Sequence, residues 1–257
     1  MKVSIVTPTY NSEEYLEKCI QSIMGQSHTD YEHIIVDGGS KDRTIEIIKK
    51  YENQYNMIWI SEPDQGMYDA IAKGFRMATG DILCWLNSDD FYMPWTLKEV
   101  STIFEKRNIH WVVGSCSSFN QKTGFSKTEL VTFPRYAIKS GWMDGTRLST
   151  IQQESSFWSK KLYDKVGGLN INLKMAGDFD LWHKFAQYET LFTVNSVFAN
   201  FRVHEGQKSS DKEKYRMETG GLNLWQKLLH RIKFYKVANK ILRIVYGNKL
   251  IIDIDSV

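Results

Sequence analysis

The sequence predicts an α/β fold in which helices cover both faces of a mostly parallel β-sheet. Strand-like and helix-like segments alternate without interruption from residue 2 to residue 86, an order typical of parallel sheets with helical crossovers. The strand-like segments are short apolar runs rich in β-branched residues, which is the pattern of strands buried on both faces. The 257 residues are 42% hydrophobic, which is enough to bury one large core.

Four strands and three helices account for the first part of the chain. The expected strands are residues 2–8, 31–37, 57–61 and 81–86, and the helices between them are residues 12–24, 41–52 and 65–80. The first helix follows an Asn/Ser cap, and its apolar residues recur at helical spacing from Tyr15 to Ile23. We expect Gly80 to close the third helix.

The pattern changes after residue 107. Residues 109–116 have the apolar pattern of a strand, and the stretch to Arg147 is rich in aromatic, Thr, Ser and Gly residues. That composition indicates strands and loops rather than helices. A further helix is expected over residues 159–168, after a polar segment.

The charge distribution divides the chain into a body, residues 1–206, and a helical tail, residues 207–257. The body carries 22 Lys and Arg against 25 Asp and Glu, whereas the tail carries 11 against 5. Residues 222–249 contain seven basic residues, no acidic ones, and apolar residues at helical spacing. A basic amphipathic helix favours an anionic membrane surface. We therefore expect residues 222–249 to dock on such a surface, and packing on the body or on another subunit is the alternative.

The composition also predicts a compartment. Cys19, Cys84 and Cys116 are widely spaced and match no metal or redox motif, which suits a reducing cytoplasm. The chain enters a strand pattern at once, and no run approaches the roughly 18 apolar residues of a membrane span. We expect a cytoplasmic protein, peripheral at the inner face of the cell membrane. No nucleic-acid motif accompanies the basic tail, and the acidic body argues against a nucleic-acid partner.

Polar residues gather where four predicted strands end. These segments are Thr7–Asn11, Asp37–Ser40, Glu62–Gln65 and Asn87–Asp90. Any one Asp among them could be a helix cap or a turn residue. Ligands of parallel α/β sheets bind beyond the carboxyl ends of the strands, so four such segments in succession indicate a binding site.

The segment "LCWLNSDDFYMP" indicates a cation in that site. The adjacent carboxylates of Asp89 and Asp90 repel each other and lose hydration on burial. The chain has neither the glycine-rich dinucleotide fingerprint nor the Gly-Lys-Ser/Thr phosphate loop. A divalent cation, Mn²⁺ or Mg²⁺, could bridge these carboxylates to a diphosphate instead.

At this point the motifs resemble a known family. "VSIVTPTYN", "HIIVDGGSKDRT", "SEPDQGMYDAIAKGFRMATGDILCWLNSDD" and "AGDFDLWHKFA" are similar, in this order, to the motifs of family-2 glycosyltransferases with the A-type, Rossmann-like fold. The resemblance implies a metal-dependent enzyme that moves a sugar from a nucleotide diphosphate to an acceptor hydroxyl with inversion. It also implies a nucleotide-binding half, residues 1–107, and an acceptor and catalytic-base half, residues 108–206.

The resemblance assigns the donor residues. Thr7, Pro8 and Tyr10 would pack the nucleotide base, Asp37 would bind the base edge, commonly uracil, and Asp64 would lie near the donor. Asn87, Asp89 and Asp90 correspond to the Asp-x-Asp-type motif. In it, Asp89 would meet the ribose or the metal, and Asp90 the metal. Asn87 departs from the commoner Asp and removes one charge.

The resemblance also assigns the catalytic base to Asp178, which would accept the proton of the acceptor hydroxyl. The common pattern has Glu before this Asp, and here the position is Gly177. A simple N-cap role is the alternative for Asp178. His204 is expected to bind the metal or the diphosphate, although a lone His is more often a structural hydrogen-bonding residue.

The segment "TIQQESSFW" is expected to contact a sugar. Its candidates are Gln152, Gln153, Glu154 and Trp158, and Trp85 and Trp142 are further rings that could stack on a sugar. An ordinary polar loop before the next helix is the alternative.

The leading hypothesis is a glycosyltransferase of surface polysaccharide synthesis that uses a nucleotide-sugar donor, with a UDP-sugar as the expected form. Its acceptor would be a glycan or a lipid-linked unit. Two alternatives stay open. A metal-dependent phosphohydrolase would use Asp37 as its nucleophile, although Gly39 stands where such enzymes need a second Asp. A non-catalytic nucleotide-sugar-binding relative would explain Asn87 and Gly177.

Overall fold

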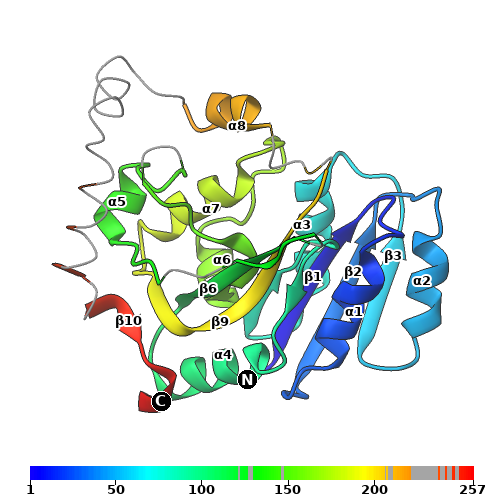
Figure 1. Ribbon diagram of the computed structural model, residues 1–257, viewed down its shortest axis with the longest axis horizontal. Helices are drawn as coiled ribbons and strands as arrows, with labels where there is room; N and C mark the ends of the chain where they lie inside the picture. Colours follow the sequence, from blue (N-terminus) through cyan, green and yellow to red (C-terminus); the bar gives the residue numbers. More distant parts are fainter. Residues whose placement is uncertain are drawn as a thin grey trace.

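The computed structural model describes residues 1–120, 122–126, 130–145, 148–205, 207, 211–220, 237, 241, 245–246 and 249–257. Within them one sheet of ten strands has the order β10-β9-β6-β8-β4-β1-β2-β3, with β5 on β9 and β7 on β6 (Figure 1). The strands are β1 (Val3–Thr9), β2 (Tyr31–Asp37), β3 (Met57–Ser61), β4 (Ile82–Trp85), β5 (Phe91–Tyr92), β6 (Trp111–Asn120), β7 (Gly124–Phe125), β8 (Ser156–Ser159), β9 (Phe192–Val203) and β10 (Ile251–Ile252).

Most strand pairs are parallel. β1 pairs in parallel with β2 and β4, β2 with β3, β6 with β9, and β9 with β10. β8 is antiparallel to both of its neighbours, β4 and β6, so β4 and β6 run in the same direction. The mostly parallel α/β sheet predicted from the sequence is confirmed.

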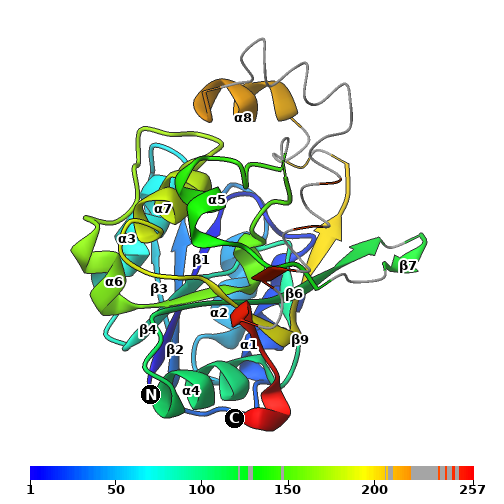
Figure 2. The ribbon, with the colours of Figure 1, turned by 90° about the vertical axis from the view of Figure 1, so that its left-hand side faces the viewer.

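Helices cover both faces of this sheet (Figure 2). They are α1 (Leu16–Met24), α2 (Thr44–Tyr51), α3 (Met67–Met77), α4 (Thr96–Lys106), α5 (Arg135–Lys139), α6 (Lys160–Lys165), α7 (Gly177–Phe185) and α8 (Lys212–Glu218), with short 3-10 turns η1 (Gln153–Ser155) and η3 (Ile254–Ser256). Alternate residues of β4 face two cores. Leu83 and Trp85 pack with α3, α6 and α7, whereas Cys84 and Leu86 pack with α1 and α4 on the other face.

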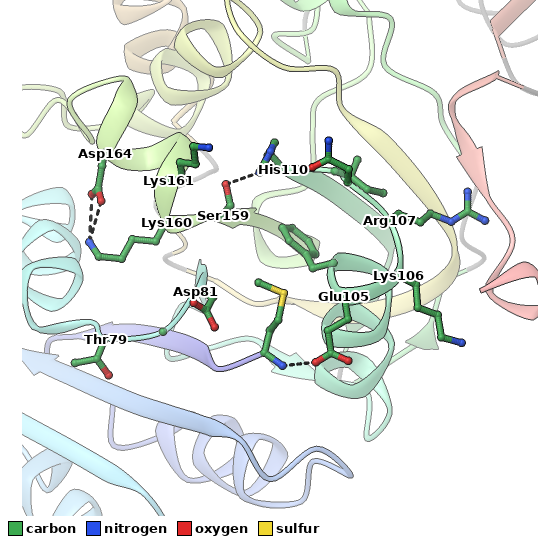
Figure 3. Close-up of a pocket in the computed structure, with 15 residues that line it drawn as sticks. Thr79, Asp81, Glu105, Lys106, Arg107, His110, Ser159, Lys160, Lys161 and Asp164 are labelled. Carbon is green, nitrogen blue, oxygen red and sulfur yellow. Dashed lines mark hydrogen bonds and ion pairs between the residues drawn. The ribbon is translucent and has the colours of Figure 1, made fainter.

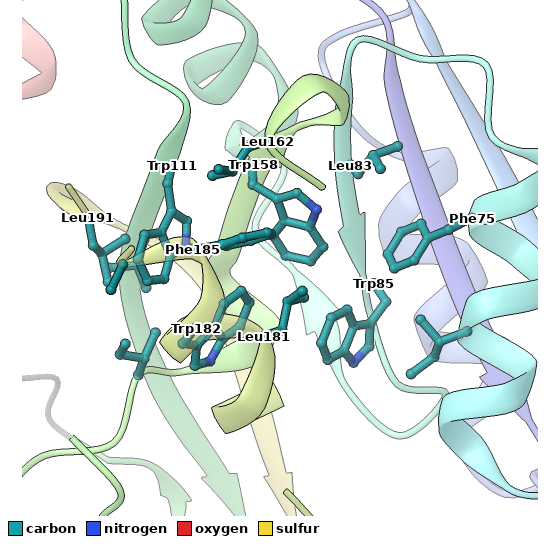
Figure 4. Packing of buried hydrophobic residues seen from close by; sticks show 14 of the residues in the cluster. Phe75, Leu83, Trp85, Trp111, Trp158, Leu162, Leu181, Trp182, Phe185 and Leu191 are labelled. Carbon is teal, nitrogen blue, oxygen red and sulfur yellow. The ribbon is translucent and has the colours of Figure 1, made fainter. Parts of the chain in front are cut away.

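Four tryptophans dominate the core on the α7 side (Figure 4). Trp85, Trp111, Trp158 and Trp182 are all fully buried side chains. The Trp182 ring of α7 lies 6.0 Å from Trp85 and 5.5 Å from Trp111, stacked on both. This cluster fixes the start of α7 relative to the end of β4, because both elements contribute to one close-packed core.

Two sequence expectations about helix ends are wrong. α1 begins at Leu16 rather than residue 12, because the preceding residues form a turn in which Ser12 O accepts from Tyr15 N. α3 ends at Met77 and its C-cap is Ala78, so Gly80 does not close it. A Cβ at position 80 would lie 2.6 Å from Ser4 Oγ, and glycine is needed there for the close approach to β1.

The tail contains more than a helix. α8 lies in it, but β10 joins the sheet beside β9, which the sequence analysis did not foresee. Most of the predicted helix over residues 222–249 lies outside the described residues. The C-terminus lies near the N-terminus (Figures 1 and 2), and Lys106 Nζ donates to Val257 O. In the described part of the chain, no helix has the length and apolar character needed to cross a membrane.

Candidate functional site

The candidate site lies at the carboxyl edge of the parallel strands, where several loops meet. Hydrogen bonds join these loops directly. Ser88 Oγ, after β4, donates to Ser12 Oγ at 2.9 Å, after β1. The backbone N–H of Asn11 donates to Ser40 Oγ, after β2, at 2.8 Å. The predicted convergence of these polar segments is therefore present.

Asp90 carries a buried oxygen without a partner. Its side chain is 1% exposed, and its Oδ1 accepts from the backbone N–H of Arg202 at 2.9 Å. Its Oδ2 is buried and has no hydrogen bond within the described structure. Burial raises the pKa of Asp90 well above its usual range, and the charges of Asp89 and Glu154 raise it further. A buried carboxylate in this state is electrostatically unfavourable unless a cation compensates it.

Asp89 faces His204, from the segment after β9. His204 Nε2 lies 3.1 Å from Asp89 Oδ2, and the His204 ring lies 4.4 Å from the ring of Tyr15. Arg202 Nε donates to the backbone oxygen of Asp89 at 2.8 Å. The contact between Tyr15 and His204 was not foreseen from the sequence, in which Tyr15 belongs to the apolar stripe of the first helix.

The donor set fits a divalent cation. Two carboxylates, one with an orphaned oxygen, and an imidazole lie together at the edge where a ligand would bind, and Mn²⁺ or Mg²⁺ prefers oxygen ligands. Among the described residues no group of three or more His, Cys, Asp or Glu is arranged to hold a metal by itself. Such a cation would complete its ligand shell with water and diphosphate oxygens.

Tyr10 and Asp64 lie together beside β2. The Tyr10 side chain is 62% exposed. A Cβ on Gly38 would lie 2.6 Å from Asp64 Oδ2 and 3.4 Å from Tyr10 Cδ2. Asp64 Oδ1 accepts from the backbone N–H of Gly66 at 2.7 Å, which leaves Oδ2 toward Gly38 and Tyr10. An exposed ring next to a carboxylate is a surface on which a planar base can stack and form hydrogen bonds.

The predicted roles of Thr7 and Pro8 are wrong. Both side chains are buried within β1, and Thr7 Oγ1 is bonded to His33 Nε2 at 2.8 Å inside the core. Both side chains pack inside the protein, so neither is exposed for a nucleotide base to pack against. Their assignment came from the family resemblance alone, and both residues lie inside β1, which continues to Thr9.

Asp37 is also enclosed. It is 0% exposed, and its Oδ2 accepts from Gly39 N at 2.9 Å and Ser61 Oγ at 2.6 Å. Ser40 donates to the same carboxylate through its backbone N–H and its hydroxyl. Asp37 therefore does not present its carboxylate to the surface, where a base edge was expected to meet it, and the carboxylate instead shapes the loop beside Tyr10. Its enclosure also counts against a phosphohydrolase with Asp37 as nucleophile.

Asp178 lies in the first turn of α7, where it is half-buried. Its Oδ1 accepts from Phe179 N at 2.8 Å and from the Tyr68 hydroxyl at 3.4 Å. Burial raises the pKa of Asp178 to about 6, against the lowering effect of these two donors, and the Glu218 charge adds to the rise. The N-cap of α7 is Ala176, so Asp178 is not the helix cap. A carboxylate with this pKa suits proton transfer near neutral pH.

The structure explains why position 177 has no side chain. A Cβ on Gly177 would lie 2.8 Å from the ring of Tyr68, which is itself 3% exposed. Tyr68 therefore occupies the space that an acid at position 177 would need, and its single hydroxyl proton is shared between Asp178 Oδ1 and the nearer Met175 O at 3.1 Å. Tyr68 is a residue of the site that the sequence analysis missed, since its helical spacing indicated core packing.

The segment around η1 connects the two acidic centres. Gln153 Nε2 donates to Trp85 O at 2.7 Å, and Asn87 Nδ2 lies 3.4 Å from Gln153 Oε1. Gln153 thus holds the loop after β4. Glu154 is 4% exposed, accepts from Cys116 Sγ at 3.0 Å, and its pKa is raised by burial and by the charges of Asp178 and Asp89.

This arrangement corrects the predicted sugar contacts. Gln153 and Glu154 are buried and engaged by the protein, so neither side chain is presented to a sugar. Trp158 is 0% exposed and Trp85 is 1% exposed, so stacking of a sugar on either ring is wrong. Gln152 is exposed and stays a candidate.

A hollow also lies at another edge of the sheet (Figure 3). A cavity of about 780 Å³ is lined by residues at the amino ends of the strands, among them Asp81 before β4 and His110 before β6. Some of its charged groups are paired, for example Lys160 with Asp164 of the same helix at 3.2 Å. It is at the opposite edge of the sheet from Asp90 and Asp178, so we assign the chemistry to the carboxyl edge.

The fold and the polar carboxyl edge together define the class of A-type glycosyltransferases. The sequence profile described as glycosyl transferase family 2 matches residues 4–167, and the chain belongs to this family. The PGL/p-HBAD biosynthesis glycosyltransferase of Mycobacterium bovis is 30% identical over 82% of this chain and 81% of its own length.

Solved structures agree on the fold. TarS from S. aureus in complex with UDP-GlcNAc matches with a TM-score of 0.68 and 20% identity, over 82% of this chain and 61% of that chain. The mannosyltransferase PcManGT from Pyrobaculum calidifontis in complex with GDP-Man and Mn²⁺ matches with a TM-score of 0.64 and 20% identity. The match covers 92% of this chain and 70% of that chain. The chain spans 66% of the length of two rickettsial relatives.

Proposed function

We propose that this protein is a metal-dependent, inverting glycosyltransferase that uses a nucleotide-diphosphate sugar, in the first place a UDP-sugar. One observation carries the proposal: the unpartnered Oδ2 of Asp90 lies beside Asp89 at the carboxyl edge of the sheet. Glu154 lies between this acidic centre and Asp178, and its pKa is raised by the charges of both Asp178 and Asp89. Support for the donor comes from TarS, a structural neighbour in complex with UDP-GlcNAc.

The donor would bind along the ends of β1 to β4. Its base would stack on Tyr10 and meet the carboxylate of Asp64, and its diphosphate would lie over Asp89 and Asp90. A divalent cation bound there would stabilise the negative charge of the leaving diphosphate. Manganese is supported by the neighbour in complex with GDP-Man and Mn²⁺. Arg202, held by the Asp89 backbone, adds positive charge at the same place.

Asp178 would act as the general base. Its carboxylate would accept the proton of the acceptor hydroxyl as that oxygen attacks the anomeric carbon from the side opposite the diphosphate, which inverts the configuration. The Tyr68 hydroxyl and the Phe179 N–H hold Asp178 Oδ1, so Oδ2 is the oxygen left for the substrate. The raised pKa of Asp178 makes it a stronger base than an exposed carboxylate.

The acceptor would be a glycan or a lipid-linked unit of surface polysaccharide synthesis. The Mycobacterium bovis relative is itself named for a biosynthetic role, as a PGL/p-HBAD biosynthesis glycosyltransferase. The tail supports docking of the enzyme at the cytoplasmic face of the membrane. Val237, Ile241 and Val245 are 58%, 53% and 55% exposed, and their spacing of four places apolar groups on one side of a helix. Removing residues 222–249 should then abolish binding to anionic vesicles but leave binding to neutral ones unchanged.

Two measurements test the enzymatic proposal. Thermal unfolding of the whole chain is followed with UDP, UDP-GlcNAc, UDP-glucose and GDP-mannose, with and without Mn²⁺. A ligand at about 100 times its dissociation constant stabilises the folded state by about 2.7 kcal/mol. Release of nucleoside diphosphate from the donor that binds is then measured for the wild type, Asp178→Asn and Asp180→Asn.

Asp180→Asn is the matched control, because Asp180 lies two residues further along α7 and pairs with Lys184 at 2.7 Å. We expect Asp178→Asn to lose about 10²- to 10⁴-fold in turnover while donor binding persists, and Asp180→Asn to keep wild-type turnover. Full turnover in Asp178→Asn would contradict the assignment of the base. Donor binding without turnover in the wild type would favour the non-catalytic relative.

A further inference from the structure

Glu218, the last residue of α8, is bound by the backbone that leads into α7. Its Oε1 accepts from the N–H of Lys174 at 2.9 Å, and its Oε2 accepts from the N–H groups of Met175 and Ala176, both at 2.8 Å. Ala176 is the N-cap of α7. Three successive amides that converge on one carboxylate fix the path of the chain just before Asp178.

This contact reaches Asp178 from a segment far along the chain, 40 residues away in the sequence. The segment from Lys174 to Ala176 is also tied on its other side, because Lys174 Nζ donates to Gln65 O at 2.6 Å before α3. Without Glu218, three backbone donors at the start of α7 would lose their acceptor. These N–H groups, together with the positive end of the α7 dipole, would then stabilise the charged form of the neighbouring Asp178 carboxylate.

We propose that Glu218 is a positioning residue for the catalytic base: it fixes the entry of α7 and sets the electrostatic surroundings of Asp178. The inference rests on the proposed function, in which Asp178 is the base. Gly177 cannot carry an acid because Tyr68 fills that space. Glu218 of α8 therefore supplies a negative charge to Asp178 that the adjacent residue cannot supply.

Among the described residues, few charged groups face Asp178, so the effect of Glu218 on the pKa of Asp178 can be measured separately from theirs. Tyr68 faces it from α3 and donates a hydrogen bond. Tyr215 faces it from α8, and its pKa is raised by burial and by the Asp178 charge. Glu154, itself buried, acts from η1. Asp180, on the same helix, is paired with Lys184. Glu218 is thus the acid of α8 that raises the proton affinity of Asp178.

The test compares two variants of α8 that remove the same charge. Glu218→Gln removes the carboxylate that binds the amides, and Glu213→Gln removes an exposed acid from the first turn of the same helix. The proton affinity of Asp178 is measured by ¹³C NMR titration of aspartate side chains labelled at the carboxyl carbon, with Asp178→Asn identifying the resonance. This readout needs no substrate. Turnover against pH is measured in parallel with the donor found by thermal unfolding.

We expect the titration of Asp178 to move down by about 0.5 to 1 pH unit in Glu218→Gln and to stay unchanged in Glu213→Gln. The acidic limb of the rate profile should move in the same direction, and turnover at neutral pH should fall about threefold or more. Glu218→Asp, which keeps the charge, should recover most of the titration shift.

An unchanged Asp178 titration in a folded Glu218→Gln protein would overturn the inference, as would an equal shift in Glu213→Gln. These outcomes are distinct from failure of the proposed function. That failure would appear as full turnover in Asp178→Asn, whatever the α8 variants do. If Glu218→Gln does not fold, Glu218→Asp decides: a carboxylate drawn back by one methylene should give a smaller downward shift of the titration.

Discussion

At the residue scale, the site depends on one carboxylate that the fold buries, Asp90, and one that it half-buries, Asp178. Asp90 and Asp178 are both held by backbone N–H groups through Oδ1, and both have raised pKa values because burial disfavours their charged forms. Such groups reduce the stability of the folded protein at neutral pH, a common property of functional sites. This leads to two predictions about stability.

Asp178→Asn should stabilise the protein at neutral pH and not in acid. The folded-state pKa of Asp178 is raised from 3.8 to about 6. The favourable contribution of its protonated form is therefore fully present below about pH 4 and is lost as pH rises through 6. At pH 7 the variant should exceed the wild type by up to about 3 kcal/mol, and the difference should vanish near pH 3.5. Chemical denaturation at a series of pH values measures the stability difference between the variant and the wild type. A difference that does not depend on pH would contradict the prediction.

Asp90→Asn should separate stability from ligand binding. The substitution removes a buried charge while an amide oxygen can still accept from Arg202 N, so the melting temperature without ligand should rise. The extra stabilisation by Mn²⁺ together with a nucleoside diphosphate should disappear, because the cation loses its carboxylate. Thermal unfolding with and without both ligands measures the two effects. A variant that keeps the Mn²⁺-dependent shift would place the cation elsewhere.

At the scale of elements, the start of α7 is the point where several parts of the chain meet. α3 supplies Tyr68, α8 supplies Glu218, and the tryptophan cluster anchors the helix through Trp182. None of these contacts is local in sequence. The position of Asp178 consequently depends on how three helices pack against one sheet. A substitution of Gly177, which contacts Tyr68, tests this dependence.

Gly177→Ala should destabilise the protein, although glycine to alanine usually stabilises a helix by about 1 kcal/mol. The new Cβ would meet the Tyr68 ring at 2.8 Å, and overpacking of this kind costs about 1–3 kcal/mol. Turnover should fall as well, because Tyr68 holds Asp178. Chemical denaturation and nucleotide release measure the two effects. Combining the change with Tyr68→Leu should relieve the stability loss, and a stabilised single variant would show that the ring can move aside.

At the scale of the whole molecule, one sheet links the donor edge, the base and the C-terminus. β10 closes the sheet beside β9, the strand that leads to Arg202 and His204. Ile252 of β10 is 2% exposed and belongs to the core with Val194 and Phe198. The end of the tail is thus part of the body, while α8 lies near the start of α7.

Removing residues 249–257 should lower the melting temperature and leave donor binding intact. The deletion exposes the β9 edge and the core around Ile252, and loss of one buried Ile side chain alone costs about 2–5 kcal/mol. The proposed donor residues Tyr10 and Asp64 lie beside β2, at the far end of the sheet from β10. Thermal unfolding and donor titration measure the two effects. A deletion that melts like the wild type would show that β10 does not contribute to the folded body.

The sequence by itself determined the α/β class, the order of the early elements and the convergence of polar segments at one sheet edge. These follow from periodicity and from the rule that parallel strands end at the same edge, and both are properties of local sequence. Family motifs added Asp89, Asp90 and Asp178 as residues of that edge. Their roles as metal ligands and as the base remain predictions.

Only the tertiary structure decided which of these side chains are free to meet a ligand. Thr7, Asp37, Gln153 and Trp158 have the right types and positions in the sequence, but long-range packing turns them into the interior. Tyr68 and Glu218 come to Asp178 from segments 110 and 40 residues away, and no local pattern records such a contact. Burial and long-range hydrogen bonding depend on how distant segments pack together, and this is why the sequence located the edge of the sheet but not the complete surroundings of the base.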